Sequence, residues 1–208
     1  MTLKNTDIYK ISTYSDWATH FYVGQVTDHE KILESFLPYL ENDEYFSEPW
    51  IYSHCKSTCQ NPKNLELPWD IFFNGIKPNV SEYLESLRPS CQYKISSNEA
   101  WVNIYSQHGF QEIHDHAFPN RAFACAYVLE FPEDSGPLVF ENTNFPIVQS
   151  TGINRIFDAF NYEKFIPKLS PGTLVIFPSW IKHYVLPNRS TDRRTTISAN
   201  FAVEGFYK

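Results

Sequence analysis

The spacing of apolar residues changes near residue 98, from a helical period to the alternation that is typical of strands. Before that point, two segments repeat apolar residues every three or four positions, as an amphipathic helix does. Thr27 and Glu30 have capping-box spacing ahead of the first segment, and Pro38 within it predicts a kink or an early end. Asn79 is the expected N-cap of the second segment. Residues 1–98 are therefore predicted to form a helical and irregular support region.

Short segments rich in β-branched and aromatic residues follow, and such segments favour strands. They are WVNIYS, QEIHDH, AFACAYVLEF, PLVFE, TLVIFPS, HYVLP and RTTISANFAV. Turn-forming residues separate them, so the succession predicts a sandwich or barrel of the jelly-roll type over residues 99–208. The less regular residues 147–168 are expected to be a loop with a short helix over the mouth of the barrel. The chain is thus predicted to be a single domain, mainly β with N-terminal helices (α+β).

Composition narrows the class of protein. With 208 residues, 42% apolar and 17% aromatic, the chain can bury a core and form a folded domain. The net charge of −7 and the lack of a long basic run argue against nucleic acid as the main partner. No apolar run is long enough to span a bilayer, and the N-terminal sequence lacks the apolar core of a secretory signal. A cytosolic (cytoplasmic) protein with no membrane partner is therefore expected.

The four cysteines are expected to be reduced thiols rather than disulfides or metal ligands. Cys55 and Cys59 lie close together beside His54, but no second pair of the CxxC kind completes a zinc site. Cysteines in a cytosolic chain are mostly reduced. Cys125 lies inside the apolar run AFACAYVLEF, so it is predicted to be a buried core thiol.

Three histidines carry the most specific chemistry in the sequence. His114 and His116 are one residue apart, and on an extended segment their side chains point the same way. His183, within PGTLVIFPSWIKHYVLP, supplies a third imidazole from a distant strand. Three ligands on one face of a metal leave positions open for substrate and oxygen, the arrangement that non-haem Fe(II) oxygenases use. We therefore expect a metal centre at His114, His116 and His183.

Asp115 leaves the ligand set partly open. On a regular strand its side chain points away from the metal, or accepts a hydrogen bond from a histidine N–H. A β-bulge at this residue would instead bring its carboxylate to the metal. The alternative without a metal is a group of solvated polar residues at the end of a strand.

Two adjacent arginines face opposite ways if they lie on a strand, so only one of them enters the barrel. Counting by twos from Arg194 gives a polar face that would line a pocket, made of Thr196, Ser198 and Asn200. Counting from Arg193 gives a largely apolar face, made of Thr195, Ile197, Ala199 and Phe201. A guanidinium is the natural bidentate partner of a carboxylate, so Arg194 is the candidate anion-binding residue. The alternative is a pair of solvated turn arginines.

The ordered pattern WVNIYSQHGFQEIHDHAF, AYVLEFPEDSGPLVFEN and PGTLVIFPSWIKHYVLPNRSTDRRTTISANF resembles the 2-oxoglutarate and Fe(II)-dependent oxygenases of bacteria and marine phages. The resemblance covers the second half of the chain, from about Trp101 to Phe201, and is most specific over residues 172–201. It implies a double-stranded β-helix (jelly roll, cupin-like) that holds iron at one open end. In that superfamily a histidine and an acid one residue apart precede a distal histidine.

The resemblance also implies roles for individual residues. His114 matches the first ligand and His183 the distal one, while His116 stands where the acid is usual. Arg194 matches the arginine that grips the far carboxylate of 2-oxoglutarate. The implied reaction converts 2-oxoglutarate to succinate and carbon dioxide and hydroxylates a C–H bond of a small-molecule or peptide substrate. No general base is needed beyond the metal ligands.

Other residues and other functions stay open on the sequence alone. Asn103 and Tyr105 share a strand face and, with Tyr127, are weaker candidates for hydrogen bonds to the cosubstrate. A three-histidine metal dioxygenase of the cupin type, independent of 2-oxoglutarate, is the first alternative function and would not need Arg194. The second alternative is a non-enzymatic β-sandwich binding module with its histidines at a surface turn. The substrate and the oligomeric state are not encoded in any recognisable motif.

Overall fold

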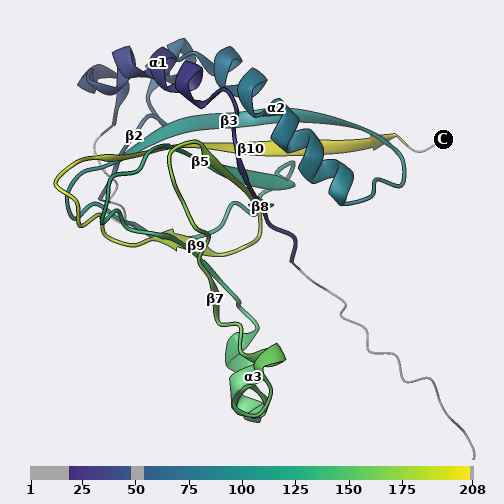
Figure 1. Cartoon of the computed structure of the whole chain (residues 1–208). Coiled ribbons are helices and arrows are strands. Elements are labelled where there is room, and N and C mark those ends of the chain that lie inside the picture. Colours follow the sequence, from purple (N-terminus) through teal and green to yellow (C-terminus); the bar gives the residue numbers. More distant parts are fainter. Residues whose placement is uncertain (1–18, 48–53, 207–208) are drawn as a thin grey trace, which may run out of the picture.

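The computed structural model describes residues 19–47 and 54–206, and the N-terminal sequence that lacks a signal-like core lies outside them. Two antiparallel sheets form the body of the molecule (Figure 1). The larger sheet has the order β1-β8-β5-β10-β3-β2. Its strands are β1 (Tyr22–Gln25), β2 (Lys56–Ser57), β3 (Gln92–Tyr105), β5 (Phe123–Glu130), β8 (Thr173–Pro178) and β10 (Arg194–Phe206).

The smaller sheet has the order β4-β9-β6-β7 and faces the larger one. Its strands are β4 (Gln111–His114), β6 (Leu138–Glu141), β7 (Lys164–Phe165) and β9 (His183–Val185). Every pairing between strands is antiparallel. The predicted mainly β jelly-roll architecture is confirmed, as two facing sheets and not a closed barrel. Each segment that the alternation predicted as a strand contains one.

Two helices cover the outer face of the larger sheet, α1 (His29–Leu40) and α2 (Trp69–Ser86) (Figure 1). Between them lie 3₁₀ turns at Asp43–Tyr45 and Pro62–Glu66. An apolar core fills the space between the helices and the sheet, with Phe36 and Phe72 fully buried against Tyr127 and Ile197. This side of the molecule is therefore a packed helix-on-sheet layer.

The capping box predicted at Thr27 and Glu30 is wrong. The helix α1 begins at His29 after Asp28, and no side chain caps its first turn. Pro38 lies in the last turn and the helix continues to Leu40, so the proline does not end it. At that place a proline costs the helix only one backbone hydrogen bond.

The second helix begins ten residues before the predicted N-cap. Asn79 lies inside α2 and is buried, where its Nδ2 donates to the backbone oxygen of Gln25 at 3.0 Å. Gly75 lets the two helices approach closely, because a Cβ there would meet Cδ1 of Ile32 at 2.7 Å. Tertiary packing therefore turns residues that favour breaks into helix interior.

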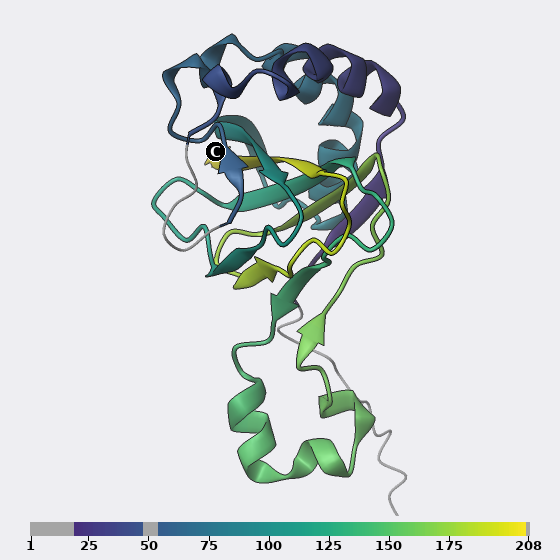
Figure 2. The same ribbon diagram turned by 90° about the vertical axis from the view of Figure 1, so that its left-hand side faces the viewer.

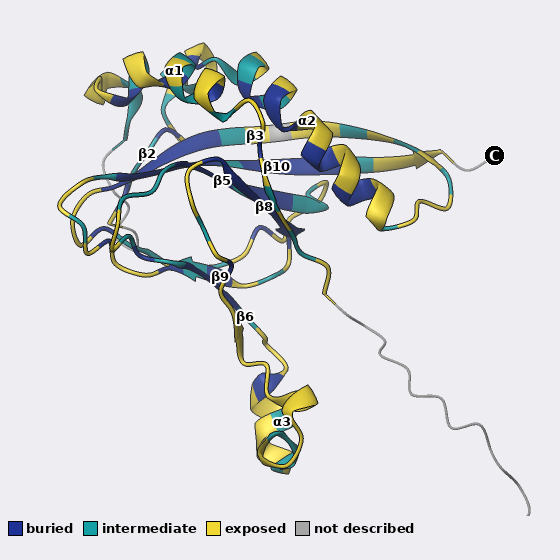
Figure 3. Ribbon diagram, viewed as in Figure 1, coloured by how far each residue is buried: buried dark blue, intermediate teal, exposed yellow. Residues whose placement is uncertain are grey.

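The smaller sheet carries an arm, residues 142–163, that leaves β6 and returns at β7 (Figures 1 and 2). It holds the helix α3 (Phe145–Thr151) and 3₁₀ turns at Ile153–Arg155 and Asp158–Phe160. A short helix was predicted here and is present. The arm projects away from the sheets and is mostly exposed, so it does not lie over them as a lid (Figures 2 and 3).

The chemistry predicted for the cysteines holds at three positions. Cys59, Cys91 and Cys125 are free thiols. Cys125 is buried, and burial raises the pKa of its thiol to about 12. In the part of the chain that the structure describes, no helix has the length and apolar character to cross a bilayer.

Candidate metal centre

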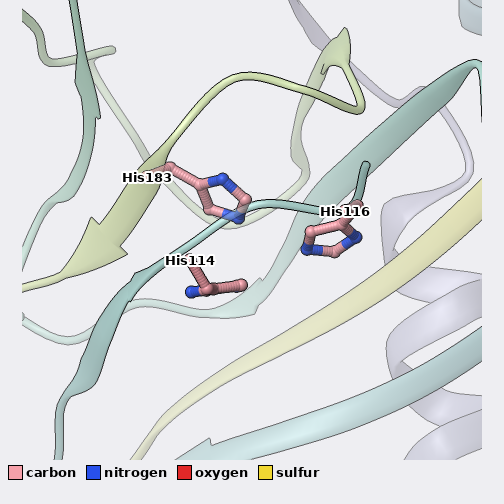
Figure 4. Close-up of side chains that lie close together, drawn as sticks. All are labelled: His114, His116 and His183. Atoms are coloured by element: carbon pink, nitrogen blue, oxygen red, sulfur yellow. The ribbon is translucent and has the colours of Figure 1, made fainter. Parts of the chain in front are cut away.

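The three histidines come together between the two sheets (Figure 4). His114 ends β4 and His183 begins β9, and the two residues are direct partners in the antiparallel register. His116 lies two residues beyond β4, where its backbone N–H donates to the oxygen of Ser179 at 2.7 Å. Strand pairing thus places two of the imidazoles, and a backbone bond to the end of β8 places the third.

The spacing of the rings suits one metal ion. One ligand nitrogen from each histidine lies within 4.8 Å of the others. Ring centroids are 4.3 Å apart for His114 and His183, and 5.1 Å apart for His116 and His183. Among the described residues, no other group of three histidine, cysteine or acidic side chains is arranged to hold a metal.

Each imidazole is held by its Nδ1 atom. In His114 this atom lies 2.7 Å from the backbone oxygen of Glu112, and in His183 it lies 2.9 Å from that of Ile181. In His116 it lies 2.6 Å from Oδ1 of Asn200. Oxygen atoms of these kinds only accept hydrogen bonds, so each Nδ1 carries the proton. The Nε2 atoms are left with their lone pairs, the form that binds a metal.

Burial keeps the imidazoles neutral. It lowers the pKa of His114 and lowers that of His183 well below the usual range. For His116 burial is again the largest cause, and the pKa falls to about 4 despite the hydrogen bond to Asn200. Metal binding requires deprotonated ligands, so all three residues are in the competent state near neutral pH.

Arg194 faces the same space and is only 1% exposed. Its Nε and Nη1 atoms are buried without a hydrogen-bond partner among the described residues. The guanidinium carbon lies 5.0 Å from the ring centroid of Tyr105 and 5.5 Å from that of Phe131. Burial of an unpaired cation is costly, and here it lowers the pKa of Arg194. Buried polar groups normally have hydrogen-bond partners, so these two nitrogens need an explanation that the surrounding side chains do not give.

A narrow cavity of about 20 Å³ joins the three histidines to Arg194. It holds about one water molecule, so a larger ligand needs its lining side chains to move. Tyr105 and Gln111 line it and are linked by a hydrogen bond of 2.8 Å between Tyr105 Oη and Gln111 Oε1. The polar face counted from Arg194 lies here as predicted, with Thr196 and Ser198 in the lining.

The other candidate residues are placed differently. Asn103 lies on the site-facing side of the larger sheet, opposite Thr196, and is 3.5 Å from Ser198 Oγ. Tyr127 lies on the helix-facing side, where its hydroxyl is 2.6 Å from Nδ1 of His29. The structure therefore places Tyr127 away from His114, His116 and His183.

Asp115 is exposed and its Oδ1 accepts a hydrogen bond from the backbone of Ala117 at 3.0 Å. It does not belong to the cluster of possible ligands. The side chain turns away from the centre, as a regular alternation predicts.

Sequence reasoning did not single out Glu99, whose carboxylate accepts a hydrogen bond from Asn200. That contact joins residues far apart in the sequence, so no local motif reveals it.

A metal-ready triad of neutral imidazoles and a buried arginine, set between the two sheets of a jelly roll, defines a non-haem metal oxygenase of the 2-oxoglutarate-dependent class. Residues 99–200 match the family described as "putative 2OG-Fe(II) oxygenase". Residues 99–200, about half of the chain, therefore belong to the 2OG-Fe(II) oxygenase family, a family of oxidoreductases that use Fe(II) and 2-oxoglutarate. The fold, family and cofactors implied by the sequence resemblance are thus confirmed.

Solved structures share the fold. A prolyl-4-hydroxylase from Pseudomonas putida superposes with a TM-score of 0.61 at 14% identity, covering 90% of this chain and 94% of that one. The non-haem epimerase SnoN from nogalamycin biosynthesis gives 0.61 at 11% identity, covering 91% and 81%. A Trichoplax adhaerens prolyl hydroxylase, in complex with a peptide fragment, gives 0.58 at 13% identity, covering 88% and 83%. No curated protein sequence matches the chain significantly.

Proposed function

We propose that His114, His116 and His183 bind Fe(II) through Nε2, and that Arg194 holds the far carboxylate of 2-oxoglutarate. One observation carries this proposal. A buried guanidinium with two unpartnered nitrogens faces the same cavity as three convergent, neutral imidazoles. A dicarboxylic keto acid that reaches from the metal to an arginine fits both groups, because a carboxylate satisfies the buried donors.

The residues around the cavity bind and orient the cosubstrate in this proposal. Fe(II) and 2-oxoglutarate together supply oxygen activation, coupled to loss of carbon dioxide and formation of succinate. Tyr105 packs against the guanidinium of Arg194 and holds Gln111, so it keeps the arginine aimed into the cavity. Thr196 and Ser198 offer hydroxyls beside it. Asn103 stays a weaker candidate behind Ser198, and Tyr127 has no place in the proposed site.

The apolar walls give the site its low polarity. Phe177 lies 4.7 Å from the His183 ring, between ring centroids, and Trp101 stacks on His116 at 5.6 Å. Leu138 and Val185 complete the lining from the smaller sheet. Such walls exclude water from the reacting groups and strengthen the bond between Arg194 and a carboxylate.

The substrate in this proposal is a small molecule or a peptide whose C–H bond is hydroxylated. A fold relative is described in complex with a peptide fragment, which supports a peptide as one candidate. Trp180, three residues before His183, is exposed and offers an apolar contact to such a substrate. We place the enzyme in the cytosol as one domain, with residues 1–98 supporting the double-stranded β-helix core at 99–208.

The test is succinate formation from 2-oxoglutarate with added Fe(II), together with calorimetry of 2-oxoglutarate binding in the presence of Mn(II) without oxygen. The wild type is expected to bind and turn over the keto acid. Arg194→Gln should lose keto-acid binding and keep metal binding, whereas Arg193→Gln is the matched control and should keep both. Unchanged keto-acid binding and succinate formation in Arg194→Gln would overturn the role of Arg194. A wild type that binds Mn(II) but neither binds 2-oxoglutarate nor forms succinate would favour a three-histidine dioxygenase that is independent of 2-oxoglutarate.

A further inference from the structure

A line of polar side chains runs from the metal centre to the surface of the larger sheet. The Nδ1 atom of His116 donates to Oδ1 of Asn200 at 2.6 Å. The Nδ2 atom of Asn200 donates to Oε2 of Glu99 at 2.9 Å. Both carboxylate oxygens of Glu99 accept from Nη2 of Arg121 at 2.6 Å. Four residues from three separate parts of the chain thus form one continuous network.

The network fixes the orientation of the Asn200 amide. An ionised carboxylate only accepts hydrogen bonds, so Glu99 forces the NH₂ group of Asn200 towards itself. The amide oxygen must then face His116, which makes the proton stay on Nδ1. Burial raises the pKa of Glu99, but the hydrogen bonds from Asn200 and Arg121 outweigh it and hold the pKa below the usual value. The ionised Glu99 therefore determines the direction of every hydrogen bond from Asn200 to His116.

His116 differs from the other two histidines in this respect. The Nδ1 atoms of His114 and His183 contact backbone oxygens only two residues away in the sequence. The partner of His116 is a side chain 84 residues away on β10. Asn200 is 1% exposed and pairs directly with Glu99 in the register of β10 and β3. Of the three Nδ1 atoms, only that of His116 has a side chain as its hydrogen-bond partner, so substitution can remove that partner.

We propose that Asn200 and Glu99 are positioning residues for His116: Asn200 fixes its tautomer, and the Glu99 carboxylate, acting through the Asn200 amide, polarises the Nδ1–H bond. The inference rests on the metal centre of the proposed function. An outer carboxylate that acts through a hydrogen-bonded group makes an imidazole a stronger ligand. Arg121 balances the charge of Glu99, so the network acts on His116 by holding and polarising its Nδ1–H bond.

The test measures the affinity of the full chain for Co(II), by competition with a chelating indicator, and the absorption bands of the bound ion. Asn200→Leu should weaken Co(II) binding by about 10- to 100-fold, the usual cost of losing such a partner. Glu99→Gln should weaken Co(II) binding less, by about 3- to 10-fold. The Asn200 amide keeps a hydrogen-bond acceptor at position 99, but that acceptor no longer carries a negative charge. Glu44→Gln, which breaks an exposed ion pair with Lys63 away from the site, is the matched control and should bind like the wild type.

A reciprocal exchange separates this role from a purely structural one. In Asn200→Asp combined with Glu99→Gln, a carboxylate accepts directly from His116 and an amide stands behind it. This pair should recover the affinity lost in Glu99→Gln and shift the Co(II) bands relative to the wild type. Glu99 is partly exposed, so its variant is expected to fold even where Asn200→Leu does not, and thermal melting of the metal-free proteins monitors this.

The outcomes are distinct. Wild-type affinity in Asn200→Leu and in Glu99→Gln, both folded, would overturn the positioning role while the metal centre stands. Loss of affinity that the reciprocal exchange fails to recover would overturn the polarising role of Glu99. A wild type that binds Co(II) no better than His183→Ala would overturn the metal centre itself, and this inference with it.

Discussion

The two faces of strand β10 show how one segment serves stability and chemistry at once. Ile197, Ala199 and Phe201 point towards the helices and belong to the apolar core. Thr196, Ser198 and Asn200 point the other way, towards the three histidines. Alternation along a strand thus divides the residues into a packing set and a site set.

The adjacent arginines make the contrast sharper. Arg193 donates to Glu130 at 2.8 Å and to Glu41 at 2.5 Å, so its charge is balanced on the helix-facing side. Arg194 is more deeply buried, yet two of its nitrogens have no partner among the described residues. A fold that only had to be stable would not keep such a cation. This difference between the two faces supports the proposal that Arg194 is kept for a ligand.

The largest effect is expected from removing a ligand on the site side. His183→Ala should abolish Fe(II)-dependent succinate formation. It should also weaken Co(II) binding more than Asn200→Leu does, for which about 10- to 100-fold is expected. The exposed His20 provides the matched control, since His20→Ala should leave both unchanged. Metal titration and a succinate assay check this. Equal loss in both variants would mean that the site side has no special role.

Phe72→Ala tests the opposite face. This fully buried side chain packs between the helices and the sheet, so its loss should lower the free energy of unfolding by about 3–5 kcal/mol. The affinity of the protein that remains folded for 2-oxoglutarate should not change. Urea denaturation and calorimetry give the two quantities. A large loss of affinity without a loss of stability would contradict the division between the faces.

Replacing each arginine by methionine should give changes of opposite sign. Arg194→Met removes an unpaired buried cation and should stabilise the ligand-free protein by about 1 kcal/mol or more. It should also weaken 2-oxoglutarate binding by about 10- to 100-fold, since hydrogen bonds to a charged group contribute about 1.5–3 kcal/mol. Calorimetry and thermal melting measure the two effects. A destabilised Arg194→Met protein with intact affinity would refute the assignment.

Acid should lower the free energy of unfolding of the metal-free protein, because the buried His116 resists protonation in the folded state. The pKa of His116 is lowered from 6.5 to about 4 in the folded state, mainly by burial. The unfolded chain therefore takes up a proton first, and stability that is present above pH 6.5 is lost as the pH falls towards 4. Between pH 7 and pH 5 this residue accounts for about 2 kcal/mol. Urea denaturation of His116→Gln should show a pH dependence that is weaker by that amount.

The smallest effect is expected at the balanced arginine. Arg193→Met breaks partly exposed ion pairs with Glu130 and Glu41 and should cost about 1 kcal/mol of stability. Binding of 2-oxoglutarate and Co(II) should stay at the wild-type level. Thermal melting with calorimetry tests both expectations. Weakened keto-acid binding here would show that the two arginines share one function.

The sequence predicted the β region well because its information there is local. Alternation of apolar and polar residues marked the strands, and counting by twos on β10 placed Arg194 and Arg193 on the correct faces. The two histidines one residue apart do point the same way, and the antiparallel pairing of β4 with β9 brings His183 to them. Local patterns were sufficient wherever one strand decides the direction of a side chain.

Features that depend on distant contacts were not predictable. The second helix was predicted to begin near Asn79, whereas it begins at Trp69, and its close packing on α1 at Gly75 is a distant contact that the sequence does not reveal. The four-residue strand β1 is too short to show a pattern. Tyr127 was a weaker candidate for a hydrogen bond to the cosubstrate, and its strand position turns it towards the helices. The contact between Asn200 and Glu99 joins residues 101 positions apart.

The register between β4 and β9 has a mechanical consequence. β4 lies at the edge of the smaller sheet, and its final residue, His114, sits directly across from His183. An ion bound by both of these imidazoles would cross-link the edge strand β4 to its neighbour β9. Detachment of β4 would then require the ion to leave first. Amide hydrogens of residues 111–114 should accordingly exchange more slowly with solvent once the metal ion is bound.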